Sequence, residues 1–161
     1  MPQVEGTIER RLTALGIFLP KASEPAAKYA NCVFSNGLLF VSGKGPAATI
    51  KGKLGNELTT AEGYQLARQA GIEVLAVLKT TLDQLDLVTR VVKVQGFVNA
   101  DPSYEEHHKV LDGFSDLMLE VFGERGIHAR SVMGASSLRN QLPIIVDSIF
   151  EVAPRIKSSN Y

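Results

Sequence analysis

The sequence predicts a single α+β domain in which one β-sheet carries two long helices on the same face. Hydrophobic periodicity indicates the order helix, hairpin, helix, strand, helix, strand, strand, and two of the helices are long with one apolar stripe each. The length of 161 residues suits one domain spanning 1–161. We expect a core over residues 28–152, preceded by a helix and an extended lead-in within residues 1–27 and followed by a polar tail over residues 153–161.

The N-terminal helix is predicted over residues 7–15, where Ile8, Leu12 and Leu15 share one face. We expect Thr7 to cap its start and a glycine at position 16 to end it. The segment after this helix contains two prolines and is expected to be extended.

A β-hairpin is predicted where Asn36 and Gly37 separate two runs of β-prone residues. A type I′ turn requires positive φ at both central positions, which asparagine and glycine tolerate best. The following stretch, GKGPAATIKGKLGNE, is expected to be a loop or an irregular strand pair.

A long helix is predicted over residues 60–82, because Thr59 and Glu62 have the spacing of a capping box and apolar residues then recur every three or four positions. The next strand is expected over residues 88–98, with Gly96 as a candidate bulge.

Asp101 and Pro102 are expected to open the second long helix, with Ser103 and Glu106 as another capping box and Gly123 at its end. Two final strands are predicted in HARSVMGAS and in residues 142–152.

The composition argues against several functions. Lys+Arg and Asp+Glu both number 17, so the net charge is zero and general binding of nucleic acid is not favoured. No apolar run approaches the roughly 20 residues that cross a bilayer, and the N-terminus lacks a secretory signal. The single cysteine, Cys32, permits no intramolecular disulfide and fits a reducing compartment. We therefore expect a cytoplasmic protein with no membrane partner.

No metal or cofactor is predicted. His107 and His108 are adjacent on a helix and point about 100° apart, and His128 stands alone. No GxGxxG, phosphate-loop or GxSxG pattern occurs.

Arg130 is the candidate binding residue because it lies within an otherwise small and apolar strand. Arginine is rarely buried without a partner. One interpretation pairs it with a nearby carboxylate such as Glu124 or Asp147. The other makes it a guanidinium fork that binds a carboxylate ligand through two parallel hydrogen bonds.

The sequence resembles the YjgF/RidA family, also described as endoribonuclease L-PSP-like, over roughly residues 28–152. The resemblance rests on KYANCVFSNGLLFVSGKGP, VVKVQGFVN, HARSVMGAS and IIVDSIFEV. Ala129-Arg130-Ser131 matches the family's A-R-S signature, and the N-terminal region resembles a longer, poorly characterised subgroup. The resemblance implies a chorismate-mutase-like fold and a homotrimer with three ligand clefts, each between neighbouring subunits.

The resemblance also implies an activity, the hydrolysis of 2-imino acids or enamines to 2-keto acids and ammonia. Arg130 matches the family's carboxylate-binding arginine. The other residues that the resemblance places in the cleft are Tyr29, Ser42, Phe97, Ser131 and Val132.

Two positions depart from the family pattern. Val132 replaces the family's cysteine, and Ile145 falls where deaminating members have a glutamate. Asp147 lies two residues further on, hence on the same side of a regular strand, and is the candidate replacement for that glutamate. The departures leave a rival function, a trimeric binding protein for a small carboxylate metabolite. A less favoured alternative, an endoribonuclease, is implied only by the family's older name.

Overall fold

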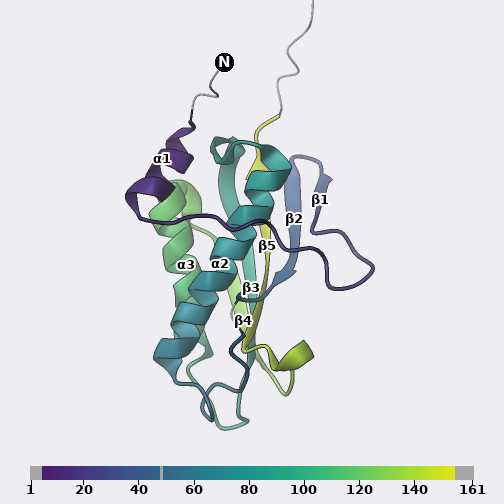
Figure 1. Ribbon diagram of the computed structural model, residues 1–161, viewed down its shortest axis with the longest axis vertical. Coiled ribbons are helices and arrows are strands. Elements are labelled where there is room, and N and C mark those ends of the chain that lie inside the picture. Colours follow the sequence, from purple (N-terminus) through teal and green to yellow (C-terminus); the bar gives the residue numbers. More distant parts are fainter. Residues whose placement is uncertain (1–4, 48, 155–161) are drawn as a thin grey trace, which may run out of the picture.

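The computed structural model describes residues 5–47 and 49–154, and it has the predicted α+β architecture (Figure 1). One five-stranded sheet has the order β1-β2-β5-β3-β4, in which β3 and β4 are parallel and all other neighbours are antiparallel. In chain order the elements are α1 (Thr7–Ala14), β1 (Cys32–Ser35), β2 (Leu38–Lys44), α2 (Thr60–Leu82), the 3₁₀ turn η1 (Leu85–Leu87), β3 (Val88–Asn99), α3 (His107–Phe122), η2 (Gly123–Gly126), β4 (Ala129–Ala135), η3 (Arg139–Gln141) and β5 (Ile144–Val152).

The predicted cap of α2 is confirmed. For α1 the predicted start at residue 7 is confirmed, but the predicted cap is not. Thr59 accepts a hydrogen bond from the Glu62 backbone, and the Glu62 side chain accepts one from the Thr59 backbone, which completes the capping box. The N-cap of α1 is Gly6, which has no side chain to offer, so Thr7 is the first helical residue and not the cap.

The start of α3 is later than predicted. Asp101 accepts hydrogen bonds from the backbone N–H and the hydroxyl of Ser103, at 2.9 and 2.6 Å. This local turn competes with helix formation, as short polar side chains often do. The helix therefore begins at His107, and the side chain of its N-cap, Glu106, makes no capping hydrogen bond, so the predicted Ser103–Glu106 capping box is wrong.

The hairpin prediction is confirmed, and the bulge prediction is wrong. Asn36 and Gly37 have φ of 48° and 77°, both positive as a type I′ turn requires. The register shifts of β3 lie nearer its start, between Val88 and Lys93. Gly96 stays in regular pairing and faces α3, where an added Cβ would lie 2.8 Å from Leu111 Cδ1. The glycine thus permits close packing of the helix on the sheet.

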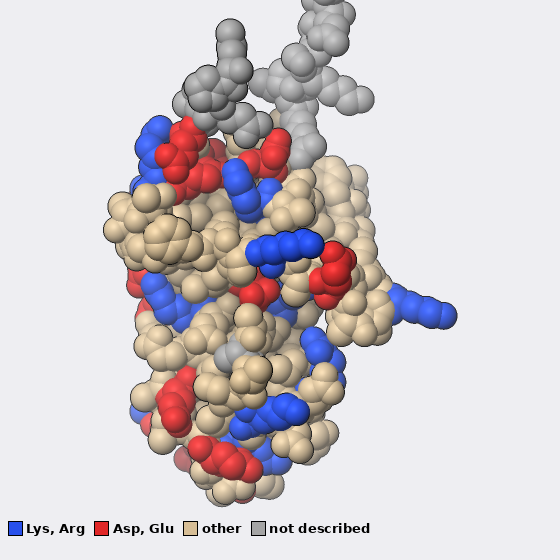
Figure 2. All heavy atoms as spheres, viewed as in Figure 1, with Lys and Arg blue, Asp and Glu red and all other residues tan. Residues whose placement is uncertain are grey.

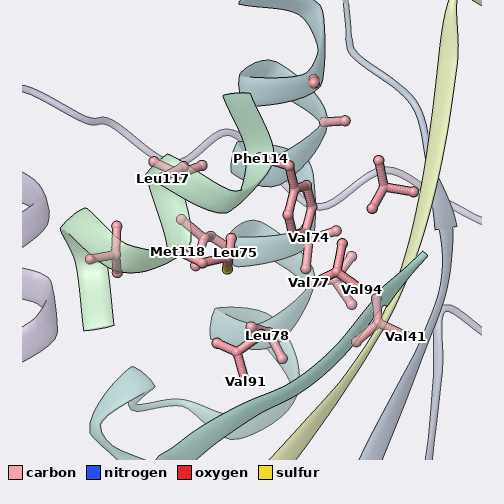
Figure 3. Close-up of a cluster of buried hydrophobic side chains, with 14 of the residues drawn as sticks. Val41, Val74, Leu75, Val77, Leu78, Val91, Val94, Phe114, Leu117 and Met118 are labelled. Carbon is pink, nitrogen blue, oxygen red and sulfur yellow. The ribbon is translucent and has the colours of Figure 1, made fainter. Parts of the chain in front are cut away.

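The core lies between the two long helices and one face of the sheet. Figure 3 shows Val74 and Leu78 of α2, Phe114 of α3 and Val94 of β3 pointing into this layer, and all four are fully buried. The helices approach most closely at Gly113, where an added Cβ would lie 2.0 Å from the Tyr64 carbonyl oxygen.

The opposite face of the sheet is not covered by any helix of the described residues (Figure 1). Large apolar side chains are exposed there or along its rim, namely Phe40 at 42%, Val33 at 58% and Met133 at 45%. We call this surface the open face.

The lead-in segment, residues 17–31, crosses the outer side of α2 and reaches the hairpin (Figure 1). Lys44, at the end of β2 and only 5% exposed, holds the lead-in segment in place through hydrogen bonds. The Lys44 ammonium donates to the carbonyl and hydroxyl oxygens of Ser23 and to Asn31 Oδ1 at 2.6 Å. Among the helices described, none is long and apolar enough to cross a membrane.

Candidate functional site

A hollow of about 490 Å³ on the open face brings four of the predicted site residues together. Tyr29, Ser42, Phe97 and Asp147 all line it. The remaining lining residues are mostly apolar and come from β1, β2 and β5: Val33, Phe40, Val41, Gly43, Ile145, Ser148 and Ile149.

Asp147 supplies the carboxyl group among the residues that line this hollow. One of its oxygens, Oδ1, is buried and has no hydrogen-bond partner among the described residues. Burial raises the pKa of Asp147, and its own backbone N–H offsets only part of that effect. Ile145, Ile149 and Phe97 supply the apolar surroundings. A carboxyl group with a raised pKa holds a proton more readily than an exposed one, which suits it to acid–base chemistry.

Ser42 and Tyr29 shape the rim of the hollow. The Ser42 hydroxyl donates to the Ala30 carbonyl at 2.6 Å, and its backbone N–H donates to Asn31 at 2.9 Å. These bonds hold the chain next to Tyr29 against β2. The Tyr29 hydroxyl oxygen accepts from the Ala26 backbone at 3.1 Å, and the hydroxyl donates to no residue that the structure describes, so its hydrogen can meet a ligand.

Arg130 points away from this hollow, toward α3. Its Nη1 lies 2.8 Å from Asp112 Oδ1 and donates to the Ser115 hydroxyl at 3.0 Å, while Nη2 donates to the His108 carbonyl at 3.0 Å. The ion-pair partner is therefore Asp112, and the sequence-based choice of Glu124 or Asp147 is wrong. Nothing in the local sequence of β4 identifies Asp112, because it lies on a different element.

A partly buried chain of polar groups continues behind Arg130. Ser115, in the apolar stripe of α3, lies 2.9 Å from His128 Nε2, and His128 Nδ1 lies 2.6 Å from the Gly126 carbonyl. A carbonyl only accepts, so Nδ1 bears the proton and Nε2 accepts from Ser115. Burial lowers the pKa of His128, and the nearby Arg130 charge acts in the same direction. The imidazole is therefore neutral at pH 7.

The two groups of predicted residues lie on opposite sides of the sheet. Arg130 and Val132 face the helices, as the contacts of Arg130 with α3 and of Val132 with the core show. The Ser131 side chain points to the other side of the sheet, because successive side chains of a strand alternate between its two faces. One chain therefore does not bring Arg130 together with Asp147, and β4, which bears Arg130, is an edge strand.

Sequence reasoning did not identify Asp112, Ser115 or His128 as partners of Arg130. The one local signal was Ser115, a polar residue among the apolar positions of a helix. Among the described residues, no group of three or more His, Cys, Asp or Glu side chains could hold a metal ion.

The layered α+β fold is that of the chorismate-mutase-like proteins, and the residues of the hollow and of β4 come from the segments that suggested the family. Residues 9–147 match the family described as "YjgF/chorismate mutase-like, putative endoribonuclease". The chain belongs to this family.

Relatives and solved structures agree with this assignment. Protein TCP17 of Trypanosoma cruzi is 40% identical over 152 residues, which cover 91% of this chain and 95% of the relative. The crystal structure of Atu1372 from Agrobacterium tumefaciens, described as of unknown function, superposes with a TM-score of 0.83 at 34% identity, covering 91% of this chain and 94% of that one. A "putative endoribonuclease" from Shewanella oneidensis has a TM-score of 0.88 at 32% identity and covers 91% and 100%.

Proposed function

We propose that this protein hydrolyses 2-imino acids, and the enamines related to them, to 2-keto acids and ammonia. The observation that carries the proposal is the Asp147 carboxyl group, whose pKa is raised by burial in a hollow shared with Tyr29, Ser42 and Phe97. An acid–base group of this kind typically contributes 10²–10⁴-fold to a rate.

In the proposed mechanism, Arg130 binds the substrate and Asp147 transfers a proton. The substrate carboxylate binds the guanidinium of Arg130, whose Nε has no hydrogen bond to a described residue. Water adds to the carbon of the C=N bond while Asp147 takes a proton from it and passes it to the nitrogen. The C–N bond then breaks, the oxygen of water becomes the keto oxygen, and both hydrogens of water leave in ammonia.

The proposal includes a homotrimer, because the two halves of the site come from different sides of one chain. A neighbouring copy that packs its β4 edge against the open face would bring its Arg130 near Asp147. It would also cover the exposed Phe40, Val33 and Met133. Burial of such apolar surface is the usual driving force for association. We place the protein in the cytoplasm, for which the lone thiol of Cys32 is the support.

A binding protein for a small carboxylate metabolite is the second candidate. Arg130 is already neutralised by Asp112, and Ile145 supplies an apolar side chain where the family has a glutamate. The third candidate, an endoribonuclease, has the family's description in its favour. Figure 2 shows basic and acidic side chains interspersed over the helix-bearing face, which does not favour RNA binding.

Imine turnover distinguishes the first two candidates. An amino-acid oxidase generates 2-imino acids in the assay, and semicarbazide traps those that are not hydrolysed. We expect the wild type to divert imine from the trap, and Arg130→Ala and Asp147→Asn to lose this activity. Arg68→Ala is the matched control, because Arg68 also pairs with a carboxylate of α3, Glu120, at similar side-chain exposure (23% against 25%).

Unchanged turnover in Arg130→Ala would contradict the proposed role of that residue. No turnover in the wild type, together with keto-acid binding that Arg130→Ala abolishes, would establish the binding protein instead.

A further inference from the structure

A second cavity, of about 510 Å³, lies beneath the lead-in segment and is separate from the open-face hollow except for Tyr29, which lines both. Its walls come from the lead-in segment, the end of β2, the middle of α2 and η3. The charged residues that line it are Lys21, Glu24, Lys44, Glu73 and Arg139. A cavity of this size readily holds a small metabolite.

Two opposite charges in this cavity make no hydrogen bond or close ion pair with a residue that the structure describes. Glu73 is 6% exposed, yet its carboxylate makes no hydrogen bond or ion pair with any residue that the structure describes. The guanidinium of Arg139 likewise makes none within residues 5–47 and 49–154. The Lys44 charge acts on Glu73 from a distance, but a buried carboxylate that accepts no hydrogen bond is still costly. These two groups do not compensate each other.

Another cation of the cavity wall, Lys44, already donates hydrogen bonds to the lead-in segment. Its ammonium donates to two oxygens of Ser23 and to Asn31, so it supplies positive potential but has little capacity for a new bond. Burial lowers the pKa of Lys44, while the charges of Tyr29 and Glu73 act in the opposite direction. Lys44 is thus a fixed part of the wall. Lys21 and Glu24 belong to the exposed part of the lead-in segment, so we take Glu73 and Arg139 as the groups that meet a ligand.

We propose that this cavity binds a small zwitterionic α-amino acid. Its ammonium group meets Glu73, and its carboxylate meets Arg139 and the free hydroxyl hydrogen of Tyr29. A simple anion would leave Glu73 without a hydrogen-bond donor, and a simple amine would leave Arg139 without an acceptor. A ligand that carries both charges satisfies the two groups at once. This site uses neither Arg130 nor Asp147, so it does not depend on the proposed imine hydrolysis.

Calorimetric titration of the purified full chain tests the proposal. The probes are L-alanine, propionate, which lacks the ammonium, and ethylamine, which lacks the carboxylate. We expect L-alanine to bind, and each analogue to bind roughly ten- to hundredfold more weakly, because each lacks one charge-assisted set of hydrogen bonds. Equal binding of propionate would overturn the proposed role of Glu73.

Variants locate the site. Glu73→Gln and the less buried Arg139→Gln should each weaken L-alanine binding about tenfold or more. Glu105→Gln, at an exposed carboxylate before α3, is the matched control and should not. Thermal unfolding of the variants checks that each is folded. If Glu73→Gln does not fold, Arg139→Gln still tests the site, because Arg139 lies outside the core.

Arg130→Ala separates this proposal from the proposed function. L-alanine binding that persists in Arg130→Ala and is lost in Arg139→Gln supports the lead-in cavity, whether or not the protein hydrolyses imines. L-alanine binding that is lost in Arg130→Ala and kept in both cavity variants would overturn the proposal and assign the amino acid to the β4 side.

Discussion

Replacing Ser115 with alanine tests whether the polar chain behind Arg130 holds the guanidinium in place. Ser115 is 8% exposed, accepts from Arg130 at 3.0 Å and meets His128 Nε2 at 2.9 Å. The change removes one hydrogen bond to a charged group and leaves the imidazole nitrogen without a donor. Net contributions of about 1 kcal/mol for the bond and about 1–2 kcal/mol for the unsatisfied nitrogen give a loss of about 2–3 kcal/mol.

The matched control is Ser148→Ala. Ser148 is also buried, at 3% exposed, but its hydroxyl has no partner among the described residues. Its replacement should leave the free energy of unfolding unchanged or raise it slightly. Urea unfolding of both variants at pH 8 measures the difference, and a loss of about 2–3 kcal/mol corresponds to about 4–12 °C in Tm for a chain of this size. Equal effects of the two substitutions would refute the proposed network.

Three further predictions concern pH and packing. Burial holds the pKa of His128 below 6.5, so the unfolded state binds its proton first, and the free energy of unfolding should fall as the pH drops below about 6.5. The fall should be smaller in His128→Gln. Urea unfolding at several pH values measures both proteins, and parallel curves of unfolding free energy against pH would contradict the prediction. Burial raises the pKa of Asp147 above 3.8, so ionisation of this carboxyl group disfavours folding. Asp147→Asn should therefore raise the free energy of unfolding at pH 7 but not below about pH 4, and a lower free energy of unfolding at pH 7 would argue against this account. Gly113→Ala should cost about 3 kcal/mol in urea unfolding because its Cβ would lie 2.0 Å from the Tyr64 carbonyl oxygen, and a cost below about 1 kcal/mol would mean that α2 and α3 separate easily.

The fold could be predicted from the sequence because its local signals agree with its packing. The capping box at Thr59 and the turn at Asn36 involve only neighbouring residues, and both form as expected. The start of α3 was missed because Asp101 and Ser103 have the residue types of a helix cap as well as those of a turn. Local sequence cannot decide between the two uses.

The candidate site was predictable only in part. Tyr29, Ser42, Phe97 and Asp147 meet in one hollow because alternate positions of neighbouring strands face the same side of a sheet. The pairing of Arg130 with Asp112 depends instead on how α3 is rotated against β4. That rotation is set by packing across the whole layer, which the pattern of a single strand does not report.

The position of β5 has a consequence for the order in which the protein folds during synthesis. β5 is the last strand of the described chain, yet it lies between β2 and β3 in the middle of the sheet. The β1–β2 hairpin and the β3-α3-β4 unit can each form as they leave the ribosome, but nothing joins them into one sheet until residues 144–152 arrive. Because Asp147 lies on this same strand, the hollow on the open face is completed in the same step that closes the sheet. A nascent chain that ends before β5 therefore has neither a continuous sheet nor the acid–base group of the proposed reaction.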